Sequence, residues 1–123
     1  MNVKDFPLRN KIVESGVEDG ITWVTAEAPC WGAVNGYVRI EGPHPWKDVE
    51  ETYDIDTTVP FGSITFREGD WFGFDTLHTG QSWPDSPLKY PDDMQMTPEL
   101  VAEWAQHLAR AAASAARADN DNI

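Results

Sequence analysis

Residues 97–112, TPELVAEWAQHLARAA, carry the strongest helical signal in the chain. Thr97 suits the N-cap, Pro98 suits the first helical position, and Glu99 places a negative charge beside the positive end of the helix dipole. Apolar side chains recur at helical spacing and form one stripe, made of Leu100, Val101, Trp104, Leu108, Ala111 and Ala112. The pattern predicts a helix over residues 97–117 that packs through this stripe.

The chain before this helix shows the period-2 alternation of β-strands. Residues 21–26, ITWVTA, alternate between two faces, and Pro29 ends the run. A second run, residues 31–40, contains Asn35-Gly36, which favours either a hairpin turn or a bulge inside one long strand. We expect the bulged strand, because the part before the dipeptide is too short to pair well.

Three further strands are expected downstream, over residues 52–59, 63–67 and 71–76, with a tight turn at residues 68–70. In the first of them, polar and larger side chains alternate as in a half-buried strand. The order predicts an antiparallel meander. The fold class is therefore α+β, with a twisted antiparallel β-sheet of four to five strands packed against one C-terminal α-helix.

The length of 123 residues predicts a single domain over residues 1–123. Its expected parts are a weakly patterned N-terminal segment over residues 1–18, the sheet over 19–78, a Pro-rich loop over 79–96, the helix over 97–117 and a frayed tail over 118–123. Within the first part, residues 11–14 fit a short strand or a turn of helix. The single cysteine, Cys30, excludes an internal disulfide, and we expect a buried thiol.

No apolar run is long enough to span a bilayer, and the N-terminus lacks an apolar leader, so a cytoplasmic protein without membrane contact is expected. The charge is strongly negative, with 21 acids, 9 bases and a net charge of −12. Such a chain repels polyanions, which argues against direct nucleic-acid binding. Between residues 41 and 93 the chain has twelve acids and only three bases, Lys47, Arg67 and Lys89.

This acidic stretch fits either a face kept for solubility or the complement of a basic surface on another protein. On a strand, Asp54 and Asp56 would project the same way at about 6.6 Å spacing. Two tryptophans in Pro-rich loops fit either lids over the core edge or anchors for a partner. The candidate partner-binding residues are Trp46, Asp48, Glu50, Glu51, Asp54, Asp56 and Trp83.

An alternative small-molecule site, for a nucleotide or for metal-assisted hydrolysis, would use His44, Asp75 and His78. A metal needs three or four converging ligands, and the spacing of these residues gives no such set by itself. No common phosphate-binding, zinc-protease or nucleophile motif is present. We therefore expect no metal and no cofactor.

Several short motifs occur in order: Gly36-Tyr37-Val38, His44-Pro45-Trp46, Asp54-Ile55-Asp56, residues 62–66 (GSITF) and residues 71–80 (WFGFDTLHTG). This series resembles a group of small tailed-phage and prophage proteins that share the pattern G-Y-V, G-H-P, D-x-D, G-G-L-T-[FY] and W-x-G-F-D-x-x-H-x-G-D. The chain departs from the pattern at residues 59–61, at Ser63 and at Gln81. The resemblance implies a mobile-element context and an α+β fold, without a mechanism.

Together these observations favour a phage or mobile-element accessory protein that binds without catalysis. The expected partner is a host protein with a basic surface, such as a defence or nucleic-acid-binding protein, which would make the chain an inhibitor of the anti-CRISPR kind. The alternative is the small-molecule site described above.

Overall fold

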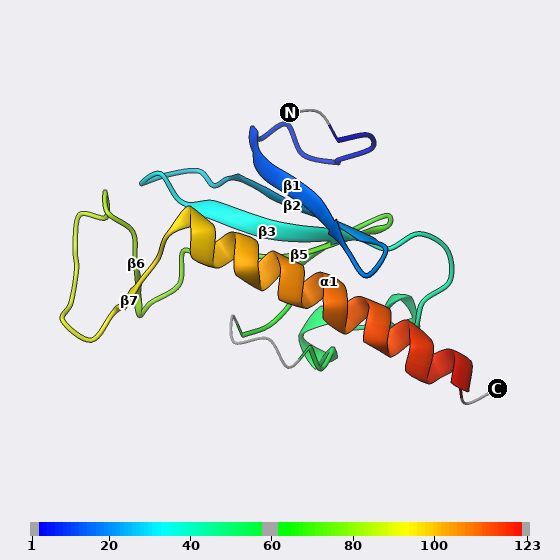
Figure 1. Ribbon diagram of the computed structural model, residues 1–123. Helices are drawn as coiled ribbons and strands as arrows, with labels where there is room; N and C mark the ends of the chain where they lie inside the picture. The colour runs from blue at the N-terminus through cyan, green and yellow to red at the C-terminus, as the bar shows by residue number, and fades with distance from the viewer. Residues whose placement is uncertain (1–2, 58–61, 122–123) are drawn as a thin grey trace.

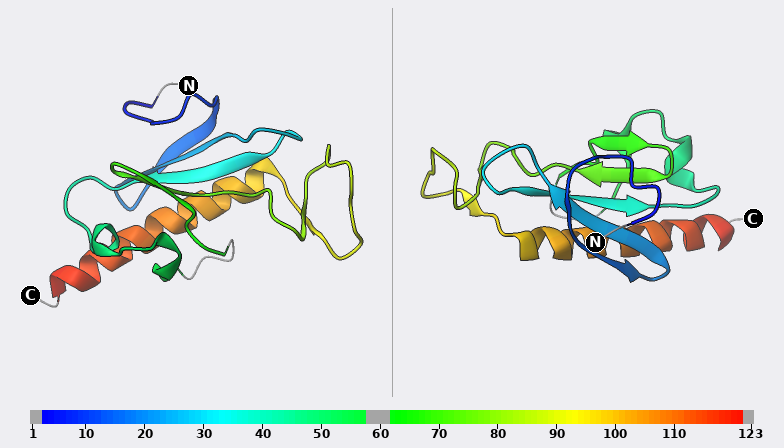
Figure 2. Two further views of the ribbon diagram at one scale, coloured as in Figure 1. Left: turned by 180° about the vertical axis from the view of Figure 1, so that it is seen from behind. Right: turned by 90° about the horizontal axis from the view of Figure 1, so that it is seen from above.

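The computed structural model describes residues 3–57 and 62–121 and arranges them in three layers (Figure 1). A five-stranded antiparallel sheet in the order β1-β2-β3-β5-β4 is the middle layer. The single long helix, α1, covers one face, and the N-terminal segment crosses the other, as the view from above shows (Figure 2). The α+β class with one C-terminal helix is confirmed.

The sheet consists of β1 (Ile12–Glu18), β2 (Ile21–Glu27), β3 (Val34–Arg39), β4 (Phe66–Glu68) and β5 (Trp71–Phe74). Two 3-10 turns follow β3, η1 (Pro45–Asp48) and η2 (Thr52–Asp54), and the two-residue strands β6 (Gln81–Ser82) and β7 (Met94–Gln95) pair in parallel before α1 (Pro98–Asp121). Because β5 lies between β3 and β4, the sheet is not the predicted meander.

The helix starts as predicted, since the Thr97 hydroxyl accepts a hydrogen bond of 3.1 Å from the Leu100 amide. Trp104 is buried, as its place on the apolar stripe predicts. The tail over residues 118–123 was expected to fray, yet α1 continues to Asp121, and residues 122–123 lie outside the described ranges. The alanine-rich run over residues 109–118 favours the helix up to Ala118, because alanine has the highest helix propensity.

Glycines on the sheet make room for aromatic rings directly across the strands. A Cβ atom at Gly36 would lie 2.3 Å from Cζ of Phe74, and one at Gly73 would lie 2.4 Å from Cδ1 of Tyr37. Each glycine is the register partner of the residue whose ring covers it. The rings thus lie flat over the backbone, an arrangement that fixes strand register. The same relation joins Gly16 of β1 and Trp23 of β2.

The expected bulge at Asn35-Gly36 is wrong. Both dipeptide residues pair with β2 in continuous register, and the irregularity of the sheet falls in β1, between Ile12 and Glu14. The chain instead reverses before β3, at residues 29–32, where Trp31 and Gly32 have positive φ. Gly36 is required for the Phe74 ring, not for a turn.

The strand expected over residues 52–59 is also wrong. Residues 52–54 form η2, which is closed by a 3.1 Å hydrogen bond from the Ile55 amide to the Thr52 carbonyl, and residues 58–59 lie outside the described part of the chain. Ile55 and Thr57 are nevertheless buried, as the alternation indicated, whereas Tyr53, which was expected on the same face, is exposed. An alternating pattern of side chains does not by itself produce a strand, because a strand also needs a neighbouring strand to hydrogen-bond with.

The other predicted strands are shorter than expected: 63–67 becomes Phe66–Glu68, and 71–76 becomes Trp71–Phe74. The N-terminal 18 residues are more ordered than their weak pattern suggested. They supply β1 and place Phe6 edge-on against Tyr37 and Trp71, with ring centroids 5.2 and 5.1 Å apart. The Trp71 indole also donates to the Asp5 carbonyl at 2.8 Å. Two aromatic clusters therefore sandwich the sheet.

Beyond the end of the sheet, residues 78–96 form a long loop next to the N-terminus of α1 (Figure 2). Asp93 fixes this loop by accepting hydrogen bonds from the Ser82 hydroxyl at 2.5 Å and the Tyr90 amide at 3.0 Å. Among the described residues, no helix combines the length and apolar content needed to cross a bilayer.

Candidate functional site

The acidic segment, residues 48–56 (DVEETYDID), contains no lysine or arginine. It comprises the end of η1, all of η2 and the residues next to them. Tyr53 is 65% exposed in the middle of the segment. Five carboxylates on the segment are exposed as well, those of Asp48, Glu50, Glu51, Asp54 and Asp56. An aromatic side chain surrounded by acids is the chemistry that complements lysine and arginine.

Buried residues hold the acidic segment against the body of the protein. Ile55 and Trp46 are 7% and 5% exposed. The Trp46 ring packs edge-on against His44 and Phe72, with centroids 5.1 and 6.1 Å apart. Because these anchors lie at both ends of the turns, the carboxylates project from a fixed base.

His44 is part of this anchor. Its Nδ1 accepts a 3.0 Å hydrogen bond from the Trp46 amide and thereby caps η1. Its Nε2 lies 2.8 Å from the Ala112 carbonyl of α1, which can only accept. The geometry therefore requires the tautomer with the proton on Nε2. Both ring nitrogens of His44 are used in holding η1 to the helix.

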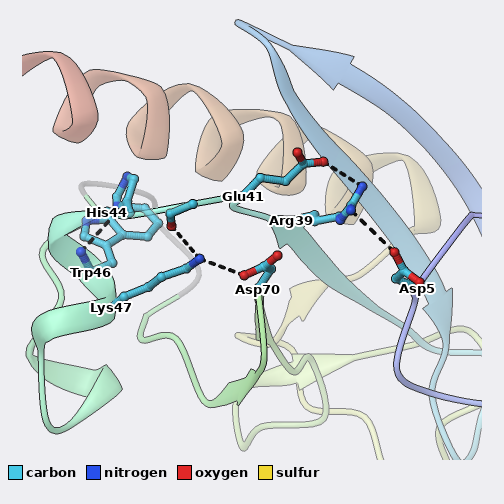
Figure 3. A network of polar contacts seen from close by, with 8 residues as sticks. Asp5, Arg39, Glu41, His44, Trp46, Lys47 and Asp70 are labelled. Atoms are coloured by element: carbon cyan, nitrogen blue, oxygen red, sulfur yellow. Dashed lines mark hydrogen bonds and ion pairs between the residues drawn. The ribbon is translucent and has the colours of Figure 1, made fainter.

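The bases closest in sequence to the acidic segment do not neutralise it (Figure 3). Lys47 Nζ lies 2.7 Å from the Asp70 carboxylate and 2.6 Å from the Gly42 carbonyl. Arg39 lies 2.8 Å from Glu41 and 3.5 Å from Asp5. These cations join loops to the sheet and pair with carboxylates that lie outside the acidic segment.

The predicted spacing of Asp54 and Asp56 is wrong, because Asp54 is in η2 and Asp56 follows it, with no strand to align them. The two loop tryptophans are not exposed anchors either. Trp83 is 1% exposed, and its indole donates to the Thr76 carbonyl at 2.9 Å. Trp46 and Trp83 instead cover the edge of the core, which was the alternative interpretation of these two tryptophans. Tyr53 is one of the exposed aromatics that sequence reasoning missed, with Trp31 and Tyr90, and its signal was its position between acidic residues.

The three residues of the alternative site do not converge. Asp75 and His78 form a pair, with 3.0 Å between Oδ1 and Nε2, whereas His44 is engaged with Trp46 and α1. Across residues 3–57 and 62–121, no group of three or more His, Cys, Asp and Glu side chains is arranged to hold a metal ion. The metal-assisted hydrolase therefore has no ligand set in this part of the chain.

Cys30 was expected to be buried, but it is exposed. The chain reversal at residues 29–32 places it on the surface, at a cavity of about 510 Å³ that Trp31 and Pro98 also line. Among the described residues that line this cavity, Glu27 carries an acid and none is a histidine, lysine or arginine that could activate the thiol.

The scan of protein-family models matches none, and the searches of curated proteins and of solved structures find no significant match. The phage-protein resemblance thus rests on the quoted motifs alone. In the structure these motifs lie on β3, around the 3-10 turns, before and at the start of β4, and on β5 and the residues after it. The acidic segment includes η2, and Asp75 and His78 follow β5.

Proposed function

We propose that this protein acts by non-catalytic binding, and that the acidic segment engages a basic surface of a protein partner. The observation that carries the proposal is the set of five exposed carboxylates around Tyr53, in a segment without a positive charge. Surface complementarity of this kind accelerates association and selects partners.

The kind of partner follows from the chemistry of the segment. A protein surface that attracts closely spaced carboxylates is rich in arginine and lysine, as are surfaces that bind nucleic acid. The resemblance to phage and prophage proteins supports a host defence or nucleic-acid-binding protein as the target, with the chain as its inhibitor. The role is therefore proposed to be occlusion of a basic surface, with no bond made or broken.

The test compares two triple variants that remove the same charge from different places. The first, Glu50→Gln, Glu51→Gln and Asp54→Asn, neutralises the acidic segment. The second, Asp85→Asn, Asp92→Asn and Glu103→Gln, neutralises three exposed acids elsewhere. Each protein, immobilised, is exposed to a lysate of host cells, and captured proteins are quantified by mass spectrometry.

We expect specific captures to fall about tenfold for the first variant and to stay near wild type for the second, because only the first changes the docking surface. Captured proteins should be basic and should be released by salt. Equal capture by both variants, with circular dichroism showing both folded, would mean that the segment is only a solvated face.

A further inference from the structure

A second polar cluster lies on the sheet face opposite α1, beyond the end of β5. A cavity of about 300 Å³ opens there, lined by Asn35, Tyr37, Thr65, Phe66, Phe74 and Asp75. It shares no residue with the acidic segment. Its chemistry is a carboxylate and a phenol beside aromatic carbon, which differs from the charged turns described above.

The Asp75 carboxylate is oriented but not saturated. Its Oδ1 accepts a hydrogen bond from the Thr65 hydroxyl at 2.9 Å and lies 3.0 Å from Nε2 of His78. Both contacts reach the same oxygen, so within the described part of the chain no donor is assigned to Oδ2. The Asp75 side chain is 45% exposed, which leaves this oxygen accessible to a ligand. A carboxylate held in this way is prepared to accept further donors.

Tyr37 is held beside this carboxylate by an oriented amide. The Asn35 Oδ1 accepts a hydrogen bond from the Thr76 backbone amide at 2.9 Å, and this fixes which end of the Asn35 amide faces the phenol. Burial of Tyr37 raises its pKa above the ordinary tyrosine value; the Asn35 hydrogen bond opposes this effect and the Asp75 charge adds to it. The phenol therefore stays neutral, and its ring meets that of Phe66 edge-on, with centroids 5.5 Å apart.

The chemistry of the lining selects the charge and shape of an occupant. No lysine or arginine lines the cavity, and the chain carries a net charge of −12, so a phosphate or carboxylate ligand would be repelled. A ligand that contacts the accessible Oδ2 of Asp75 must donate a hydrogen bond to it. Aromatic carbon next to it suits a flat, weakly hydrated cation better than a compact, strongly hydrated ammonium.

We propose that this cavity binds a guanidinium group, with Asp75 accepting its N–H donors and the aromatic side chains covering its flat face. The group belongs either to an arginine side chain of a protein or to a small free molecule. The site is independent of the acidic segment, so it stands or falls separately from the proposed function.

The probe is blocked arginine, N-acetyl-arginine amide, titrated into ¹⁵N-labelled protein and followed by NMR. Saturable shifts are expected at the Asn35 side-chain amide and the Gly73 and Asp75 backbone amides. Blocked citrulline, the neutral analogue, and blocked lysine should bind at least about tenfold more weakly. Asp75→Asn should weaken arginine binding by a similar factor, whereas the matched variant Asp92→Asn, which removes one exposed charge outside both proposed sites, should leave it unchanged.

Equal binding of arginine, citrulline and lysine, or no loss in Asp75→Asn, would overturn the proposal. Should Asp75→Asn fail to fold, Tyr37→Phe keeps the ring and must still discriminate arginine from citrulline for the proposal to survive. A Gly-Arg-Gly peptide and butylguanidinium separate the two sources. Tighter binding of the peptide identifies an arginine side chain, and tighter binding of the small cation identifies a free molecule.

Discussion

Substituting Gly36→Ala should strongly destabilise the fold, because the new methyl group has no space. Its Cβ would lie 2.3 Å from Cζ of Phe74, while carbon atoms in contact are about 3.5 Å apart. The ring must therefore move by about 1 Å. Phe74 is only 1% exposed and packs against Trp104, with centroids 6.2 Å apart, so little room exists for that movement. Overpacking of this kind costs about 1–3 kcal/mol.

The assay is a double-mutant cycle measured by urea unfolding, with Phe74→Leu as the second substitution. Phe74→Leu alone removes the far atoms of the ring and should cost about 1–2 kcal/mol. In the double variant the smaller side chain should accommodate the new methyl group, so the total cost should fall below the sum of the single costs by about 2 kcal/mol. Additive costs, or a Gly36→Ala protein of wild-type stability, would refute the placement of the Phe74 ring over this glycine.

Three further outcomes are expected. Trp104→Ala should cost about 3–5 kcal/mol, because it empties the contact between α1 and the sheet; an unchanged thermal midpoint would show that the helix is detached. His44→Ala should cost about 2–3 kcal/mol in urea unfolding, because the Trp46 amide and the Ala112 carbonyl lose their partner inside the protein, and a cost near zero would contradict that anchor. The Ser82 hydroxyl and the Tyr90 amide hold the pKa of Asp93 below its ordinary value. The ionised Asp93 carboxylate therefore stabilises the fold above about pH 4, and this contribution is lost as the pH falls through the folded-state pKa of Asp93, which is lower than its unfolded-state pKa. The stability difference between wild type and Asp93→Asn should accordingly shrink on acidification, and a pH-independent difference would contradict this role.

The parts of the fold that were predictable from sequence have local causes. The start of α1 follows from Thr97 and Pro98, whose effects act within one helical turn. The strand β2 follows from alternation between Ile21 and Ala26, which lies at the centre of a real ladder. Each signal was sufficient because no distant residue competes with it.

The errors have non-local causes. Asn35-Gly36 has the composition of a turn, but the Asn35 amide binds Thr76 and the missing side chain of Gly36 makes room for Phe74. Residues 52–59 alternate without a neighbouring strand to pair with, so the described part of this stretch forms a 3-10 turn. Neither partner could be identified from the sequence near these residues.

In the candidate site, too, some features have local causes and were predictable from sequence, whereas others depend on distant residues. Exposure of the acids in residues 48–56 was predictable, since charged side chains rarely enter a core. The burial of Trp83 depends on the distant Thr76 carbonyl, and the electrostatic effect of Asp75 on Tyr37 depends on how β3 and β5 align. These two features could be recognised only from the tertiary structure.

The most direct measurement of the central claim is the rate at which the protein associates with its captured partner as a function of salt. Between about 50 and 500 mM NaCl, the wild-type rate constant should fall by at least about tenfold. The Glu50→Gln, Glu51→Gln and Asp54→Asn variant should associate more slowly and with a shallower salt dependence. A wild-type rate that is insensitive to salt, or the same salt dependence in that variant, would contradict binding through the acidic segment.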